Sequence, residues 1–203
     1  MTNSVAAEIA VQAARLVVED GLDYGSAKRR AARDLRLQGG GTPELPDNET
    51  VEDEVRAYIA LFHADTQPAE LAALRATAVV WMERLAAFRP HLTGAVWRGT
   101  ATRQSDVHID LFCDDSKAAE LALIDRDIDY DVVPGENRDA ADVLVVHERV
   151  RGGPPRRVAL HIHDYDDLRG ALKRDVRGRP WRGDLAATRA AIAAASNDDP
   201  EGG

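Results

Sequence analysis

The stretch from Asp106 to Phe112 alternates polar and apolar residues, with Asp106, His108 and Asp110 in polar positions. This period of two predicts a strand with one face on the core and the other available for chemistry. Carboxylates suit a hard ion such as Mg²⁺, whereas imidazole is better suited to Mn²⁺, Zn²⁺ or Fe²⁺. Asp106, His108 and Asp110 are thus of residue types that can bind a metal ion, and the two carboxylates could act together only if the ion lies low on the strand.

Further histidines lie on later predicted strands. His161 and His163 alternate near the end of one strand, and His147 lies on the strand before it. If His108, His161 and His163 share a sheet face, they and an aspartate could form a transition-metal site. A solvated strand face is the alternative, and both interpretations stay open because the strand order is not given by the sequence.

Helices are expected to precede the Asp106 strand, since apolar residues recur there at helical spacing. The first helix halts at Gly21, the second starts near Gly25, the third is capped by Asp47 or Asn48, and the fourth runs from near Pro68 to before Pro90. After the strand we expect a helix from Ser116 to about Asp127, strands at 128–133, 143–150 and 156–163, a hairpin tip at 151–155, and a helix at 185–195.

These elements predict an α/β (α+β) fold, with an N-terminal helical region packed on a small mixed sheet. The expected organisation is a helical region at 1–66, a sheet domain at 67–195 and a disordered polar tail at 196–203. A length of 203 residues, with 44% hydrophobic and 30% charged residues, is enough for a substantial core.

The net charge of −9 argues against a protein covered with nucleic-acid-binding surface. A local basic cluster remains a candidate RNA contact or, alternatively, a solvated helix face. It comprises Lys28, Arg29, Arg30 and Arg33. With no secretory signal and no membrane-spanning segment apparent, the expected location is the cytoplasm, where Cys113 would be a buried strand thiol.

The segment from Gly94 to His108 resembles a known signature: a glycine turn, an Arg-Gly step at 98–99, and a Ser-Asp pair at 105–106 leading into a strand. It is similar to the signature of the nucleotidyltransferase (DNA polymerase beta-like) superfamily. The resemblance implies a fold of that type at 67–195, a nucleoside triphosphate as partner, and Mg²⁺ or Mn²⁺ as cofactor. It implies catalytic roles for Asp106, His108 and Asp110, and nucleotide contacts from Gly94, Arg98, Gly99, Thr100 and Ser105.

Two positions depart from that signature. Ala95 stands where the superfamily carries serine, and His108 stands where it carries the second carboxylate. A third carboxylate is expected on a neighbouring strand, and the candidates are Glu148 and Asp164. The N-terminal segments 20–32 and 45–48 are also similar to a bacterial family of uncharacterised proteins, sometimes labelled UDP-N-acetylmuramate–alanine ligase. The chain has no Gly-x-x-x-x-Gly-Lys-Ser/Thr phosphate loop, which such a ligase would need.

Two functions follow as hypotheses. In the first, the protein is a divergent metal-dependent nucleotidyltransferase that moves a nucleoside monophosphate from a nucleoside triphosphate to a hydroxyl of RNA, a protein or a small molecule. In the second, it is a catalytically inactive member of the same fold that binds a nucleotide or RNA.

Overall fold

The computed structural model describes residues 5–36, 44–134, 142–150 and 155–197, and the chain divides into two compact units. The first unit runs to Leu71 and includes a returning segment, Thr100–Ser105. The second comprises Ala72–Gly99 and the chain from Asp106 onward. Within the described residues, no helix combines the length and apolarity that crossing a bilayer requires.

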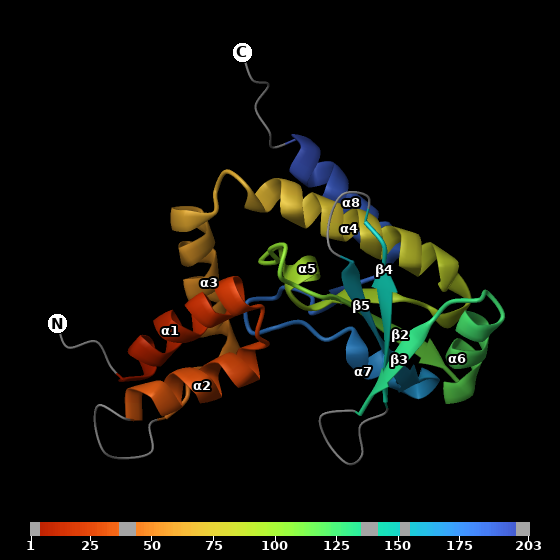
Figure 1. Ribbon diagram of the computed structural model, residues 1–203, viewed down its shortest axis with the longest axis horizontal. Helices are drawn as coiled ribbons and strands as arrows, with labels where there is room; N and C mark the ends of the chain where they lie inside the picture. Colours follow the sequence, from red (N-terminus) through yellow and green to blue (C-terminus); the bar gives the residue numbers. More distant parts are fainter. Residues whose placement is uncertain (1–4, 37–43, 135–141, 151–154, 198–203) are drawn as a thin grey trace. The chain divides into compact units, whose positions relative to one another are not determined.

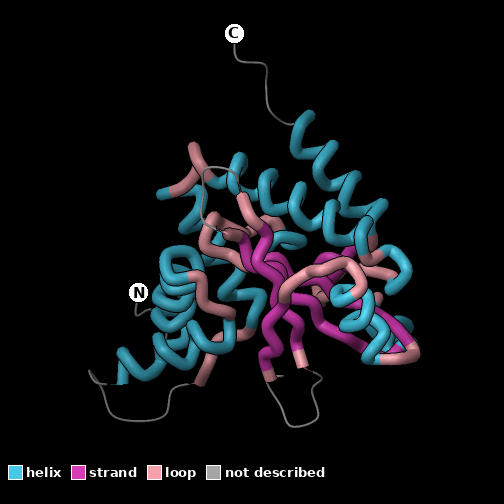
Figure 2. Tube along the Cα trace, turned by 45° about the vertical axis from the view of Figure 1, so that its right-hand side comes forward, coloured by secondary structure: helices cyan, strands magenta, loops and turns pink. Residues whose placement is uncertain are grey.

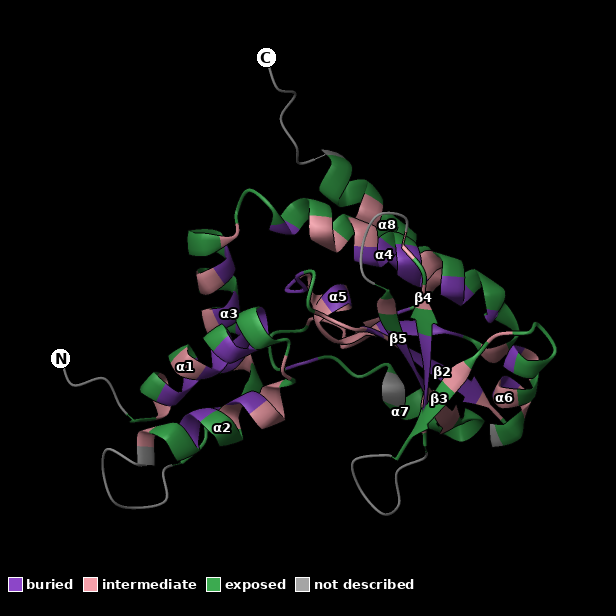
Figure 3. Cartoon of the chain, in the orientation of Figure 1, coloured by how far each residue is buried: buried purple, intermediate pink, exposed green. Residues whose placement is uncertain are grey.

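Three helices build most of the first unit: α1 (Val5–Asp20), α2 (Tyr24–Arg36) and α3 (Asn48–Phe62). Each buries one apolar stripe, seen as purple segments in Figure 3, and Ile9, Val51 and Val55 are fully buried where the stripes meet. The Asp47 side chain caps α3 by accepting a hydrogen bond from the Thr50 backbone N–H at 2.7 Å. The predicted helical start of the chain is confirmed.

A six-stranded mixed sheet forms the centre of the second unit, in the order β3-β4-β5-β2-β1-β6 (Figures 1 and 2). The strands are β1 (His91–Thr93), β2 (Val107–Cys113), β3 (Tyr130–Val133), β4 (Val143–Glu148), β5 (Arg156–Asp164) and β6 (Arg182–Gly183). β2 and β5 pair in parallel, and the other neighbours are antiparallel. The predicted α/β (α+β) class is confirmed.

Longer and shorter helices accompany this sheet. They are α4 (Gln67–Arg84), which begins in the first unit, η1 (Ala86–Phe88), α5 (Gly94–Arg98), α6 (Ser116–Ile124), η2 (Tyr165–Asp167), α7 (Leu168–Ala171) and α8 (Leu185–Asn197). α8 lies alongside α4 (Figure 1), where the Thr188 hydroxyl is 3.8 Å from the Met82 sulfur. α8 ends at Asn197, two residues beyond the predicted end of the last helix. Residues 198–203 of the predicted tail, and residues 151–154 of the predicted hairpin tip at 151–155, lie outside the described residues.

Candidate functional site

The acidic strand has the predicted alternation. Val107 and Ile109 are fully buried in β2, while Asp106, just before the strand, and His108 are only partly buried. Since alternate residues of a strand share a face, Asp106, His108 and Asp110 lie on the face opposite Val107 and Ile109. This confirms the predicted orientation of the strand.

β5 adds three more polar side chains to the same face. Its parallel register pairs Asp110 with His161 and Phe112 with His163, and Arg157 reaches Asp106. We use the name polar face for the six residues Asp106, His108, Asp110, Arg157, His161 and His163. The register therefore places His108, His161 and His163 on one sheet face, an arrangement that the sequence had left open.

Gly94 begins a turn beside the polar face. It directly follows β1, has a φ of +68°, and starts the short helix α5, as predicted. A side chain built at Gly94 would meet the His108 ring, with its Cβ 3.5 Å from the His108 Cδ2. Glycine is favoured here because L-residues with a side chain rarely adopt this φ. The glycine turn thus lies directly against His108.

Asp106 is at the edge of the polar face and keeps 26% of its side chain exposed. Its Oδ2 forms an ion pair with the Arg157 guanidinium at 2.9 Å. Burial raises the pKa of Asp106 above its ordinary value, and the positive charges of Arg157 and His147 offset only part of that rise. The charged form of this carboxylate is therefore less stable, relative to its protonated form, than that of a fully solvated aspartate.

Asp110 is buried, and an arginine and a histidine lie against its carboxylate. Its carboxylate lies 2.8 Å from Arg182 of β6 and 3.2 Å from the Nε2 of His163. Burial alone would raise the pKa of Asp110, but the His163 hydrogen bond and the Arg182 charge outweigh it and lower the pKa. Sequence reasoning missed Arg182 and Arg157. The available signal was that an aspartate in a core strand needs a nearby cation.

His108 and His161 meet across the β2–β5 pair. The His108 Nδ1 is 2.9 Å from the His161 Nε2, and the ring centroids are 5.2 Å apart with planes inclined by 30°. One ring donates an N–H hydrogen bond to the other in this contact, and the tautomers of the two rings decide which is the donor. His147 does not join them, because its Nε2 is 3.1 Å from the Asp131 carboxylate on β3.

The geometry of the two carboxylates does not fit one Mg²⁺ ion held by Asp106 and Asp110 together. Four residues along a strand span about 13 Å, whereas Mg²⁺ holds its ligands at about 2.1 Å. Both carboxylates are also paired with arginines. Among the described residues, no three His, Cys, Asp or Glu side chains converge as a metal-binding group.

Neither candidate for the third carboxylate lies on the polar face. Glu148 accepts a hydrogen bond from the Trp81 indole of α4 at 3.0 Å, so it projects from the opposite face of the sheet. Asp164 lies out of phase with His161 and His163 on β5, and caps η2 by accepting from the Asp166 backbone N–H at 2.9 Å. Glu148 was a candidate only if it faced the site, which depends on a strand pairing that the sequence does not reveal, whereas the phase of Asp164 follows from its position next to His163.

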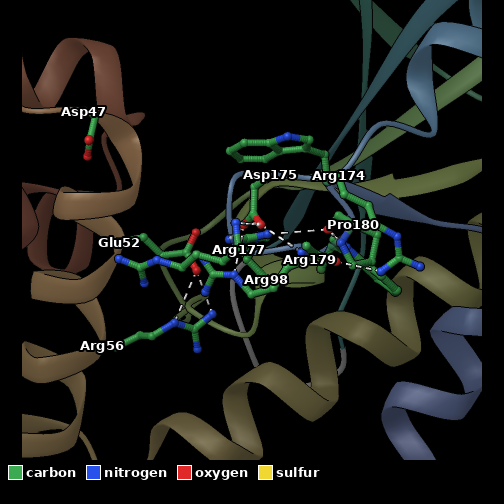
Figure 4. A network of polar contacts seen from close by, with 12 residues as sticks. Asp47, Glu52, Arg56, Arg98, Arg174, Asp175, Arg177, Arg179 and Pro180 are labelled. Atoms are coloured by element: carbon green, nitrogen blue, oxygen red, sulfur yellow. Dashed lines mark hydrogen bonds and ion pairs between the residues drawn. The ribbon is translucent and has the colours of Figure 1, made fainter.

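Arg98 holds a loop of the second unit (Figure 4). Its side chain is 6% exposed and forms an ion pair with the fully buried Asp175 carboxylate at 2.8 Å. The guanidinium also lies over the Trp181 ring, 5.0 Å from the centroid. Gly99 ends α5 with a φ of +79°, a conformation that favours glycine. We therefore expect Arg98 to fasten this loop rather than contact a phosphate.

The other two predicted nucleotide contacts belong to the first unit. Thr100 is 2% exposed, and the Ser105 hydroxyl accepts a hydrogen bond from the Thr102 backbone N–H at 3.1 Å. The hydrogen bond between Ser105 and Thr102 stabilises the returning segment Thr100–Ser105. A nucleotide contact from Thr100 or Ser105 stays a prediction.

No protein-family model matches the chain, and no curated protein matches it. Among solved structures, it is similar to Cid1 in complex with the UTP analogue UMPNPP, with 15% sequence identity and a TM-score of 0.34. The match covers 49% of this chain and 31% of the Cid1 chain. A mutant of the Cid1 poly(U) polymerase bound to MgATP matches with 13% identity, 49% and 33% coverage and the same TM-score. An antigenic nucleotidyltransferase-like protein from Paracoccidioides brasiliensis matches with 13% identity, 55% and 60% coverage and a TM-score of 0.34. The chain spans about a third of the length of the Cid1 chains.

Proposed function

We propose that this protein binds a nucleoside triphosphate, with the phosphates against the Gly94 turn and the polar face. The observation that carries the proposal is the glycine turn at Gly94 beside His108, where an added Cβ would lie 3.5 Å from the imidazole ring. A glycine turn lets backbone N–H groups approach phosphate oxygens. Arg157, with half of its side chain exposed, and the neighbouring imidazoles can add charge-assisted hydrogen bonds.

Binding is tested by thermal unfolding with each of the four common nucleoside triphosphates, with and without Mg²⁺ or Mn²⁺. A nucleotide at about a hundred times its Kd stabilises the folded protein by about 2.7 kcal/mol, which in a chain of this size raises Tm by roughly 5–10 °C. Absence of any rise at millimolar nucleotide would contradict the proposal.

The location of the nucleotide is tested with Arg157→Ala. Loss of one charge-assisted phosphate contact is expected to weaken binding by about 1.5–3 kcal/mol. Arg30→Ala is the matched control, because Arg30 is a half-exposed arginine with an aspartate partner, Asp20, in the other unit. Equal losses from both variants would show that the phosphates lie elsewhere.

Transfer of a nucleoside monophosphate to a hydroxyl of RNA, a protein or a small molecule is the second candidate function. The partly exposed Asp106 at the start of β2 favours it, since the superfamily signature places a catalytic carboxylate there. Incubation with radiolabelled nucleotide and Mg²⁺ or Mn²⁺, with total RNA or the protein itself as acceptor, tests it. If His108 replaces a needed carboxylate, His108→Asp should raise Mg²⁺ affinity and permit transfer. Binding without transfer in either protein would leave the inactive, nucleotide-binding function.

RNA contact by the first unit is proposed through the basic cluster on α2. Arg29 and Arg33 are exposed there, while Lys28 donates to the Asn48 side chain at 2.7 Å and Arg30 pairs with Asp20. Exposed pairs of this kind contribute little stability, so RNA phosphates can displace them. A joint Arg29→Ala, Arg33→Ala variant should lower RNA affinity and the salt dependence of binding, without changing binding of a mononucleotide.

A further inference from the structure

The spacing of the His108 and His161 rings suits two imidazole ligands of one metal ion. Zn²⁺ binds imidazole nitrogen at about 2.0–2.1 Å, so two histidines on a tetrahedral ion have ring centres about 5.2 Å apart. The two rings are 5.2 Å apart already. We propose that His108 and His161 form a two-histidine site for Zn²⁺ or a similar divalent transition metal, which lies on the polar face but binds the ion without nucleotide.

Only small movements are needed to bind such an ion. The facing nitrogens, now 2.9 Å apart, have to reach about 3.4 Å, the tetrahedral separation for those bond lengths. Rotation of the two rings in place achieves this without moving a strand. The backbones of β2 and β5 are held by a parallel register from Val107–Val158 to Cys113–Asp164, so the spacing of the two rings is set by the sheet.

The surroundings favour a borderline ion over Mg²⁺. The carboxylates of Asp106 and Asp110 are neutralised by Arg157 and Arg182, so the site offers nitrogen rather than anionic oxygen. Imidazole binds zinc, nickel, cobalt and copper well, and magnesium poorly. Two protein ligands leave the remaining positions of the ion to water or an added ligand.

Metal binding has to displace the proton between the rings. The donor ring can move its proton to its other nitrogen, so a neutral pair binds the ion without net loss of a proton. Only a neutral imidazole nitrogen can bind the metal. Among nearby charged groups, Arg157 and Arg182 oppose an added cation, and Asp106 and Asp110 balance the two arginines.

The test uses the full chain without a polyhistidine tag and without nucleotide. Equilibrium dialysis against Zn²⁺, and Co²⁺ titration followed by visible absorption, should each give one ion per chain, with a shift of the cobalt bands as imidazole replaces water. His108→Gln and His161→Gln should each weaken binding at least about tenfold, since even partners of metal ligands contribute ten- to a hundredfold. His147→Gln, which removes an exposed histidine of β4, should leave binding unchanged.

Nitrogen-detected NMR of the unaltered protein provides a readout that does not depend on a variant folding. Zn²⁺ should shift His108 Nδ1 and His161 Nε2 and leave the His147 ring in place. Failure to bind one ion per chain, binding that survives both substitutions in folded variants, or Zn²⁺ shifts confined to other histidines would each overturn the proposal. Because nucleotide is absent, these outcomes are independent of nucleotide binding.

Discussion

At the scale of single residues, the two aspartates of the polar face differ in the direction in which folding shifts their pKa. Asp110 is buried beside Arg182 and His163, and its pKa is lowered. Asp106 has one partner, Arg157, and burial leaves its pKa raised. A carboxylate kept charged at the expense of stability is typical of a functional site rather than a structural one.

Asp106→Asn is therefore expected to increase the stability of the folded protein slightly at pH 7. A folded-state pKa above the unfolded value means that wild type loses stability as pH rises from about 4, and the variant lacks this loss. Arg157 loses its partner at little cost because it is half exposed. Urea unfolding of both proteins at pH 4 and pH 7 measures the effect, and a variant less stable than wild type at pH 7 would contradict it.

Asp175 is the opposite case. Burial would raise its pKa, but hydrogen bonds from Arg179, Arg98 and the Arg177 backbone hold the pKa well below its usual range. A depressed folded-state pKa contributes stability above about pH 4 that is lost progressively as pH falls below that value. The gap in unfolding free energy between wild type and Asp175→Asn should therefore shrink from pH 5 to pH 2. A gap that stays constant with pH would show that the carboxylate charge is not what stabilises this loop.

At the scale of elements, α5 is held in place by Arg75 of α4. This arginine is 8% exposed and donates to the carbonyls of Val96 at 3.2 Å, Ala191 at 3.3 Å and Trp97 at 3.5 Å. The first and last carbonyls belong to the short helix that starts at the Gly94 turn. The turn is thus supported from behind by a buried cation, even though α5 is too short to be stable alone.

Arg75→Met keeps most of the side-chain volume and removes these bonds. A loss of about 2–4 kcal/mol is expected, because buried carbonyls lose charge-assisted partners. Arg84→Met is the control on the same helix: Arg84 is 43% exposed, and its ion pair with Glu148 should contribute under about 1 kcal/mol. Chemical denaturation measures both, and similar losses would mean that the burial of Arg75 is unimportant.

The strands show how far sequence alone predicts this sheet. β2 and β5 were predictable, because their residues alternate over a full strand length. β1 and β6 have three and two residues, too few for a period, so β6 was missed together with Arg182. The parallel pairing of β2 with β5 depends on contacts distant in sequence, and for that reason the His108–His161 contact could be anticipated only as a shared face.

The site residues divide in the same way. Gly94 was predictable because its conformation is a local property of the backbone. The ion pair of Arg98 with Asp175 was not predictable, because Asp175 lies in a loop without any helical or strand pattern. Local backbone geometry can be predicted from residues adjacent in the sequence. Ion pairs between residues distant in the sequence can be identified only once the fold is known.

At the scale of the whole molecule, each unit has a buried core of its own. All three tryptophans, Trp81, Trp97 and Trp181, belong to the second unit, so their fluorescence reports on that unit, while far-UV circular dichroism reports on both. Ile9→Ala, in the fully buried core of the first unit, should cost about 2–5 kcal/mol there.

If the units unfold separately, Ile9→Ala shifts the circular dichroism transition to lower denaturant and leaves the fluorescence transition unchanged. Val107→Ala, at a fully buried position of β2, is the converse control and should shift the fluorescence transition. Coincident shifts of both signals in the Ile9 variant would indicate that the two units unfold as one.

The position of β6 in the sheet has a consequence for synthesis of the chain. Leu92 of β1 pairs with Gly183 of β6, and Asp110 receives its Arg182 partner from the same late strand. Ribosomes add about 5–20 residues per second, so β1 and β2 emerge several seconds before β6. The helices of the first unit, whose contacts are local, can form in that interval. The sheet cannot be completed in that interval, because the buried Asp110 carboxylate lacks its ion-pair partner until Arg182 is synthesised, late in the described chain.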